Sequence, residues 1–292
     1  MPEVLIPVGP GDKKEWVQRT LASATAISDK VTVYDNSERE DLGELIDRFN
    51  VRHVKDRKLE TVNMAKLRNK LLSLATENVV ITMDSDVVIP SAESLVKKVN
   101  EDGYAYSWMH YAYSEEELKR PRAVGEENPN LGCAALNVEK IREIGMFDEK
   151  YARDEDIWLY SKLKKKGMTV GPVEERCLHL NSSHLRKDFR TSLREARRNL
   201  WRTKYDMMMV FDGLTDFTFL TGYLYYGSYY VIGASSVLFP PISLMFFPII
   251  GFGIKYYGGL RKWGYNLLPG LALAISLPYG FLWNVLRTLR GK

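Results

Sequence analysis

The first half of the chain alternates short apolar runs, bounded by turn residues, with longer segments whose apolar residues recur at helical spacing. In chain order these are Val4 to Val8, Lys14 to Ile27, Val31 to Tyr34, Leu42 to Phe49, Val62 to Leu74 and Val79 to Met83. This alternation predicts βαβ units, which build a parallel sheet covered by helices on both faces. Ligands bind such sheets beyond the carboxyl ends of the strands, so we expect the functional site there.

A second block completes the same α/β domain, which we place at residues 1–184. It holds an aromatic strand-like run at Tyr104 to Tyr113, a small-residue stretch at Gly132 to Ala135 and a charged helix from Glu155 to Lys166. The stretch from Glu115 to Pro129 combines glutamates with prolines and a glycine, which is typical of a mobile loop over a site.

A basic amphipathic helix is predicted within residues 185–216. Between Leu185 and Lys204 there are eight Arg or Lys against two acids, while apolar residues recur at helical spacing. An ordinary solvated helix packed on the first domain explains this pattern. Its position just before the apolar region favours contact with a membrane surface instead. In that interpretation Arg194 and Arg198 meet the phosphate of a lipid.

The last part of the chain, residues 217–292, is predicted to be a membrane region of several passes. From Phe217 to Ile254 there is no charged side chain, and this stretch exceeds the ~20 residues that a helix needs to cross a bilayer. Pro240-Pro241 divides it near the middle. The predicted membrane segments lie at about 218–239, 241–257 and 267–287.

The third of these segments leaves the topology open. Basic residues stand on both sides of it: Lys255, Arg261 and Lys262 before it, and Arg287, Arg290 and Lys292 after it. Basic residues mark the cytoplasmic side, whereas a simple crossing puts one of these ends outside. Pro269 and Pro278 are therefore interpreted as marking a re-entrant or broken segment.

The amino-acid composition indicates a cellular compartment, but it does not indicate a binding partner. Lys and Arg number 41 against 37 Asp and Glu, and a formal net charge of +4 gives no reason to expect nucleic acid. Cys133 and Cys177 are the only cysteines, too few for a disulfide framework and without the spacing of a zinc site. The run from Met1 to Val8 does not resemble a signal peptide. We therefore expect the first domain in the cytoplasm.

The strongest local signal is the triplet Asp84-Ser85-Asp86, which directly follows the apolar run Val79 to Met83. Two carboxylates this close repel each other unless a cation bridges them. Mg²⁺ or Mn²⁺ binds one or two carboxylates and completes its shell with phosphate oxygens and water. The triplet thus predicts a divalent-metal site that stabilises a leaving diphosphate, with solvated turn residues as the alternative.

Several runs resemble family 2 glycosyltransferases over roughly residues 3 to 205. They are Val31 to Ser37, Ala65 to Asn69, Val79 to Asp86, and Gly145 to Asp148 leading to Glu155-Asp156. The resemblance implies the GT-A fold, a Rossmann-like α/β domain that binds a nucleotide-diphospho-sugar.

The resemblance also assigns the nucleotide side of the site. Asp35, with Asn36, is implied to bind the nucleobase or ribose, and Pro7 and Val8 at the first strand end are implied to border the nucleotide. Arg68 is implied to lie near it. The alternative for Asp35 and Asn36 is a helix-capping turn, and the alternative for Arg68 is a structural ion pair.

On the acceptor side, Asp156 resembles the general base of the family, which implies inversion at the anomeric carbon. Glu155 and Trp158 belong to the same region. Crowding of acids and a neighbouring tryptophan raise the pKa of a carboxyl, which suits a base. The alternative is an acidic helix start, which the helix dipole favours. If the acceptor is a lipid phosphate, Asp156 orients it, because that phosphate is already ionised.

His179 stands where related enzymes carry a histidine that reaches the metal or the diphosphate; His184 is a weaker candidate for the same role. A plain surface histidine is the alternative. The chain also departs from the family pattern, since Gly9 to Asp12 replaces a Thr-Tyr-Asn-like turn and Trp158 replaces a residue that is often acidic. The nucleotide contacts of the first turn therefore do not transfer.

The sequence favours sugar transfer from a UDP- or GDP-sugar to a membrane lipid, as in the polyprenyl- or dolichyl-phosphate sugar synthases that the layout resembles. A glycolipid or exopolysaccharide transferase with a hydroxyl acceptor is the alternative. A nucleotidyltransferase also pairs an α/β sheet with acidic metal ligands, but Pro7 to Lys14 only partly imitates its Gly-rich loop. The last alternative is a non-catalytic membrane scaffold.

Overall fold

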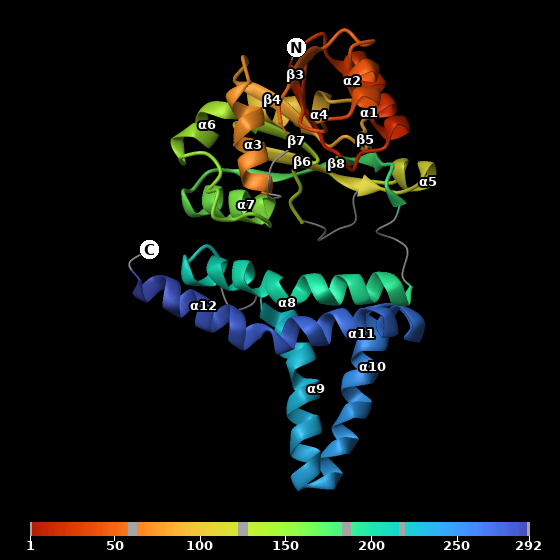
Figure 1. Cartoon of the computed structure of the whole chain (residues 1–292), viewed down its shortest axis with the longest axis vertical. Helices are drawn as coiled ribbons and strands as arrows, with labels where there is room; N and C mark the ends of the chain where they lie inside the picture. The colour runs from red at the N-terminus through yellow and green to blue at the C-terminus, as the bar shows by residue number, and fades with distance from the viewer. Residues whose placement is uncertain (1, 58–62, 122–127, 183–187, 216–219, 291–292) are drawn as a thin grey trace. The chain divides into compact units, whose positions relative to one another are not determined.

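The computed structural model describes residues 2–57, 63–121, 128–182, 188–215 and 220–290. The chain divides into two compact units, Met1–Ser182 and Ser183–Lys292, drawn in red to green and in green to blue in Figure 1. The boundary lies two residues before the one expected from the sequence.

An eight-stranded sheet organises the described part of the first unit, in the order β3-β2-β1-β4-β7-β6-β8-β5. The strands are β1 (Glu3–Val8), β2 (Val31–Asp35), β3 (Arg52–Lys55), β4 (Val79–Met83), β5 (Val87–Val88), β6 (Tyr106–Ala112), β7 (Cys133–Asn137) and β8 (Val170–His179). β1, β2, β3 and β4 pair in parallel, as the alternation of apolar runs predicts. Every residue of β1, β2 and β4 is buried, which explains their continuous apolar runs.

The other half of the sheet is mixed, so the parallel sheet expected from the first half of the chain does not extend through it. β6 pairs with β8 in parallel. β7 runs antiparallel to both β4 and β6, and β5 runs antiparallel to β8. The small-residue stretch Gly132 to Ala135 supplies most of β7, and its short side chains fit between two buried strands. Antiparallel pairing needs no crossover helix, so the βαβ pattern in the sequence stops after β4.

Seven helices are described in the first unit. They are α1 (Lys14–Ile27), α2 (Glu40–Ile46), α3 (Met64–Ser73), α4 (Glu93–Asn100), α5 (Glu115–Leu118), α6 (Val138–Glu143) and α7 (Glu155–Lys165). α3 begins where the Asn63 side chain accepts a hydrogen bond from the backbone N–H of Lys66, which caps the helix. The predicted loop from Glu115 to Pro129 contains α5, and its middle lies outside the described residues.

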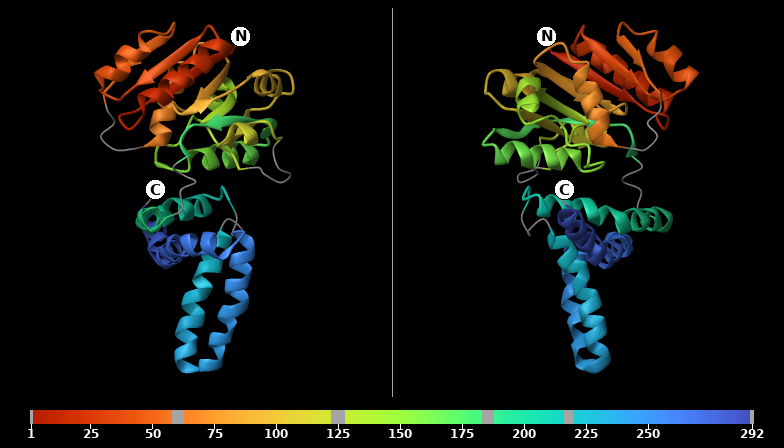
Figure 2. Two further views of the ribbon diagram at one scale, coloured as in Figure 1. Left: turned by 90° about the vertical axis from the view of Figure 1, so that its right-hand side faces the viewer. Right: turned by 60° about the vertical axis from the view of Figure 1, so that its left-hand side comes forward.

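The second unit consists of helices. They are α8 (Phe189–Phe211), α9 (Thr221–Leu238), the 3₁₀ helix η3 (Pro240–Met245), α10 (Phe246–Tyr256), α11 (Leu260–Ile275) and α12 (Leu277–Leu289). Within this unit α9 lies beside η3 and α10 as a hairpin, whereas α11 and α12 run along α8, crosswise to the hairpin (Figures 1 and 2). α8 is the predicted basic helix, although residues 185–187 of the prediction lie outside the described part.

The predicted membrane segments correspond to α9, to η3 with α10, and to parts of α11 and α12. In the described part of the chain, Leu260–Leu289 is the helix that is long and apolar enough to cross a bilayer, judged by length and composition alone. It is interrupted at Ser276, so the segment is broken, close to Pro278.

Candidate active site

The carboxyl ends of β1, β2 and β4 form one edge of the sheet, and the first site residues follow these ends. A cavity of about 240 Å³ opens there, lined by Pro7, Gly9, Asp12, Asn36, Met64, Leu67, Asp84, Ser85 and Asp86. The predicted triplet thus lies beside two of the residues expected to border a nucleotide. Val8, the other residue expected at the end of β1, is fully buried, and its carbonyl accepts the N–H of Asn36 at 3.0 Å.

Asp84 is held between a backbone contact and a buried arginine. Its N–H donates to the carbonyl of Gly132 at 2.9 Å, and its Oδ1 accepts from Arg68 Nη2 at 2.9 Å. A Cβ atom on Gly132 would stand 2.4 Å from Asp84 Oδ2 and 2.1 Å from the Tyr111 hydroxyl. Only glycine allows these two groups to approach so closely. Burial, followed by the charge of Asp84, raises the pKa of Tyr111 well above its ordinary value, so this phenol stays protonated.

Asp86 and His179 are brought together by the pairing of β5 with β8. Val87 pairs with His179, and His179 Nε2 lies 3.7 Å from Asp86 Oδ1. His179 is the last residue of β8. His184 lies outside the described residues.

The pair fits a divalent metal by the chemistry and spacing of its donors. Two ligands that share one Mn²⁺ or Mg²⁺ stand roughly 3–4 Å apart, since each lies about 2.1 Å from the ion. Burial lowers the pKa of His179, which keeps the imidazole neutral and able to coordinate. No group of three or more His, Cys, Asp or Glu suited to a metal is found among the described residues. A bound metal thus needs further ligands from the donor substrate.

Ser85 is fixed from two sides. Its carbonyl accepts from Thr20 Oγ1 of α1 at 3.0 Å, and its hydroxyl is hydrogen-bonded to Asp12. Asp12 Oδ2 also accepts the N–H of Gly9 at 2.8 Å, and Arg39 Nη1 donates to the Asp12 carbonyl at 2.6 Å. The departure from the family turn at Gly9 to Asp12 therefore puts a third carboxylate into the cavity wall. Sequence reasoning missed Asp12, although its place in that unusual turn was a signal.

Asp35 makes a tight turn at the end of β2, and it does not cap α2. Its Oδ1 accepts the N–H of Ser37 at 2.9 Å, and its Oδ2 lies 3.2 Å from His53 Nε2. His53 Nδ1 in turn lies 2.5 Å from Asp47 Oδ1. Asp35 lines a neighbouring cavity of about 330 Å³, while Asn36 lines the one beside Asp84. The two residues thus border adjacent cavities.

Arg68 connects the triplet Asp84-Ser85-Asp86 to the start of α7. It is 3 % exposed, and its Nε lies 3.9 Å from Glu155 Oε1. Although burial opposes its charge, Asp84 and Glu155 keep the pKa of Arg68 above its ordinary value. Nε and Nη1 have no hydrogen-bond partner among the described residues. The structural ion pair considered from the sequence is therefore present, and two buried nitrogen atoms of the guanidinium keep N–H groups without an acceptor among the described residues.

The start of α7 carries a buried acid, Glu155, and a half-buried one, Asp156. Burial raises the pKa of Glu155 to about 7, against the opposing charge of Arg68, and burial raises the pKa of Asp156 to about 6. Asp156 Oδ1 accepts the N–H of Ile157 at 2.8 Å. Asp154 precedes them with a left-handed backbone, φ 59°, and its side chain does not cap the helix. Asp156 is thus poised near neutral pH, as a general base must be.

Other predicted residues lie elsewhere. Trp158 is 4 % exposed and packs between Phe147 and Tyr151, with ring centroids 6.1 Å from each, so it anchors α7 to the segment that precedes the helix. Arg194 and Arg198 are exposed on α8 in the second unit.

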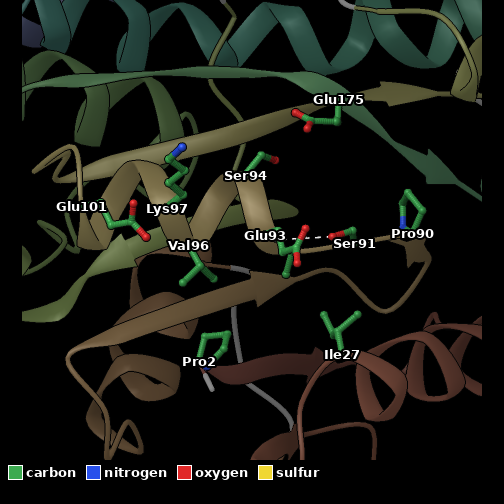
Figure 3. A pocket seen from close by; sticks show the side chains of 11 residues that line it. Pro2, Ile27, Pro90, Ser91, Glu93, Ser94, Val96, Lys97, Glu101 and Glu175 are labelled. Atoms are coloured by element: carbon green, nitrogen blue, oxygen red, sulfur yellow. Dashed lines mark hydrogen bonds between the residues drawn. The ribbon is translucent and has the colours of Figure 1, made fainter.

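A larger cavity of the first unit lies away from this site. It holds about 790 Å³ and lies near the amino end of β1, as Pro2 on its wall shows (Figure 3). Its lining mixes apolar side chains with Glu93, Lys97, Glu101 and Glu175, and none of the predicted site residues belongs to it.

Comparisons with known proteins agree with this geometry. The family model described as "Glycosyl transferase family 2" matches residues 5–154. No curated protein matches the chain. Among solved structures, the mannosyltransferase PcManGT from Pyrobaculum calidifontis, with GDP-Man and Mn²⁺, aligns at a TM-score of 0.64 and 15 % identity over 97 % of this chain and 88 % of that one. GalNAc-T7 with UDP, GalNAc and Mn²⁺ aligns at a TM-score of 0.50 and 15 % identity over 61 % and 44 %. At such identity the likeness shows the fold.

Proposed function

The chain belongs to glycosyltransferase family 2, with a GT-A first unit, and from this premise we propose that it transfers a sugar from a UDP- or GDP-sugar to a membrane lipid. Polyprenyl or dolichyl phosphate is the leading acceptor. Family membership makes the chain a glycosyltransferase and excludes the nucleotidyltransferase and the non-catalytic scaffold. The observation that carries the proposal is the pairing of Asp86 with His179, 3.7 Å apart, at the cavity that Asp84 lines.

Asp86 and His179 hold a divalent metal, Mn²⁺ or Mg²⁺, with Asp84 beside them. When bound, the metal neutralises the charge that develops on the departing nucleoside diphosphate. Two structurally similar glycosyltransferases were solved with Mn²⁺, which supports this assignment.

The nucleotide occupies the cavity between Pro7, Asn36 and the triplet. Asp35, which lines the adjacent cavity, binds the nucleobase or the ribose. Arg68 donates from Nε and Nη1, the two nitrogen atoms without a partner among the described residues, to oxygens of the donor. A buried guanidinium with unsatisfied N–H groups costs free energy until a ligand accepts them, so donor binding is favoured at this position.

In the reaction, an acceptor oxygen forms a bond to the anomeric carbon from the face opposite the diphosphate. The bond between that carbon and the diphosphate oxygen breaks, so the configuration inverts and the nucleoside diphosphate leaves. An ionised lipid phosphate needs no base, and Asp156 then orients it, with Glu155 held in place by Arg68.

A hydroxyl acceptor, as in glycolipid or exopolysaccharide synthesis, is the second candidate. The pKa of Asp156, raised to about 6, favours it, because a carboxylate of that basicity accepts a hydroxyl proton more readily than an ordinary aspartate.

The second unit supports a lipid rather than a soluble acceptor. Its hairpin exposes large apolar side chains, and α8 exposes Arg194 and Arg198, which suit lipid phosphate. We place the protein in the cell membrane with its first unit in the cytoplasm.

The decisive experiment incubates the purified full chain with UDP- and GDP-sugars and Mn²⁺ or Mg²⁺, with and without extracted membrane lipid. The proposal expects nucleoside diphosphate release that depends on lipid and metal, and a glycosylated lipid detected by mass spectrometry. Lipid phosphate and lipid hydroxyl products differ in acid lability and mass. Release that needs only a soluble acceptor would overturn the lipid assignment.

A further inference from the structure

Polar side chains attach α11 to α8 inside the second unit. Ser192 Oγ donates to the carbonyl of Tyr265 at 2.8 Å, and Asn199 Nδ2 donates to the carbonyl of Pro269 at 3.0 Å. The hydroxyls of Thr203 and Ser276 are hydrogen-bonded at the point where α11 ends.

The attachment continues along α12. Asn284 Nδ2 donates to the carbonyl of Lys204 at 2.9 Å, and Arg287 Nη2 donates to Asp212 Oδ1 at 2.6 Å. A Cβ atom on Gly280 would stand 2.8 Å from the carbonyl oxygen of Thr203, so the two helices touch through their backbones. From residue 192 to residue 212 these contacts follow α8 for roughly 30 Å, at about 1.5 Å per residue.

α8 itself cannot lie in hydrocarbon. It exposes Arg190, Arg194, Arg197 and Arg198, and an arginine at the centre of a bilayer costs roughly 2.5–3.5 kcal/mol each on insertion scales. A helix pair that is attached to α8 over its whole length cannot cross the bilayer without drawing α8 in. The segment Leu260–Leu289 is long and apolar enough to cross a bilayer. Its contacts with α8 nevertheless argue against such a crossing.

α12 carries the surface of a helix that lies on a membrane. Its exposed apolar residues recur at helical spacing and continue from Ile275 at the end of α11, which is 58 % exposed. The exposed fractions along α12 are 48 % for Tyr279, 59 % for Leu282, 51 % for Leu286 and 77 % for Leu289. Such a stripe enters the boundary between head groups and acyl chains while the opposite side packs on protein. An in-plane helix also keeps the basic residues at both ends on one side, which resolves the conflict in the sequence.

The hairpin of α9, η3 and α10 has the opposite character. It carries no charged side chain before Lys255, and Val237, Leu238 and Phe247 are 82 %, 89 % and 74 % exposed. The tyrosine hydroxyls of α9 are paired within the protein, as in Tyr226 with Tyr257 at 2.6 Å. A hairpin whose polar groups are hydrogen-bonded and whose surface is apolar can lie in the hydrocarbon core of a bilayer. The 18 residues of α9 span about 27 Å, close to the ~30 Å of a bilayer core.

We propose that the hairpin of α9, η3 and α10 is the part that enters the bilayer, and that α11 and α12 lie in the membrane plane with both ends on the side of α8. This inference rests on the proposed membrane association and goes beyond it, because it assigns insertion to one hairpin and gives the third predicted segment a place in the membrane plane.

The test uses single cysteine substitutions in the full chain: Arg190→Cys on α8, Lys262→Cys and Arg290→Cys at the two ends of the pair, and Ser243→Cys at the hairpin tip. Cys133 and Cys177 are buried and give the background in the unsubstituted chain. Right-side-out and inverted membrane vesicles are treated with a membrane-impermeant maleimide.

Positions 190, 262 and 290 should react in the same vesicle orientation, and position 243 should not react in it. Reaction of 262 and 290 in opposite orientations, or failure of either to react in both, would overturn the in-plane arrangement. Reaction of Ser243→Cys together with Arg190→Cys would overturn insertion of the hairpin. Recovery of the chain in a salt-washed soluble fraction would instead remove the membrane association on which the inference rests.

Discussion

Asp86 is the single residue whose replacement tests the metal site most directly. Asp86→Ala removes one of the two proposed protein ligands, so we expect donor binding to lose its dependence on Mn²⁺ and turnover to fall at least 100-fold. Titration calorimetry with UDP- and GDP-sugars, with and without Mn²⁺, measures the first effect. Asp102→Ala, at an exposed position after α4, is the matched control and should change neither. Turnover unchanged in Asp86→Ala would rule out the metal assignment.

Asp156 tests the acceptor chemistry. Asp156→Asn keeps the acceptor oxygen for the Ile157 N–H but cannot take a proton, so donor affinity should persist while transfer falls. If the acceptor is a hydroxyl, we expect roughly a 100-fold or larger fall in kcat. The wild-type rate should then decline about tenfold per pH unit below about pH 6, because the base becomes protonated.

With a lipid phosphate acceptor the same variant should lose much less, and the acid limb near pH 6 should be absent. A pH–rate profile on the lipid identified by mass spectrometry thus distinguishes the two acceptors. A variant that loses donor affinity as well would show that Asp156 acts mainly in binding.

Gly132 tests the close approach of Asp84 and Tyr111. In Gly132→Ala the new Cβ meets both side chains at 2.1–2.4 Å, so Asp84 must move away from the cavity. We expect donor affinity to fall at least tenfold, with a smaller loss of stability. Gly11→Ala, in the turn beside the same cavity, has nothing within 4 Å of its Cβ and serves as the control. Equal affinities for the two variants would contradict the role given to Gly132.

At the scale of secondary-structure elements, α7 carries the proposed catalytic residue Asp156, and the ionised form of this residue lowers the stability of the fold. Its Asp156 has a pKa of about 6 in the folded chain, against an ordinary value of 3.8. The folded state therefore binds this proton more tightly, and stability falls as pH rises from about 4 to about 6, then stays level. Asp156→Asn removes that cost, so at pH 7.5 we expect the free energy of unfolding to rise by on the order of 2 kcal/mol.

Near pH 4 the same substitution should bring no gain, since wild-type Asp156 is then protonated. Thermal unfolding of the full chain in detergent between pH 4 and pH 8 measures the difference. Glu143→Gln, an exposed acid on α6, should leave Tm unchanged across the range. A stabilisation by Asp156→Asn that is independent of pH would contradict the assigned pKa.

The sequence predicted the elements that obey one simple period. β1, β2 and β4 are buried on both faces, so they appear as unbroken apolar runs, and their carboxyl ends placed Asp35 and Asp84 correctly. The strand pairing in the mixed half was not predicted, because β8 has no unbroken apolar run. β8 contains Gly171, Pro172, Glu174 and Glu175, and only pairing with β6 and β5 makes it a strand that ends at His179.

The sequence predicted which residues belong to the candidate site, but it did not predict the contacts between them. Asp84, Asp86 and Asp156 stand in recognisable runs, so a single sequence can name them. That Arg68 joins Asp84 to Glu155, or that Asp12 binds Ser85, depends on segments that are far apart in the chain. Burial of Trp158 was equally invisible, because an aromatic residue beside acids suits a core and a ligand surface alike.

For the whole molecule, the central question is which apolar segment meets lipid. Hydropathy selects Leu260–Leu289, while contacts select the hairpin, because the first is attached to a charged helix and the second exposes its apolar side chains. A charge placed in each segment distinguishes these answers. Val231, halfway along α9, is 66 % exposed, and Thr288 is exposed on α12.

We expect Val231→Arg to release the chain from membranes far more readily than Thr288→Arg. An arginine in the middle of the hairpin costs about 3 kcal/mol in hydrocarbon, roughly a 100-fold weaker insertion, whereas an arginine at the membrane surface costs little. Quantifying the chain in supernatant and pellet after alkaline carbonate extraction measures the difference. If Thr288→Arg were the variant that is released, the C-terminal segment would be the one in the bilayer, and the attachment of α12 to α8 would have to break in the membrane-bound protein.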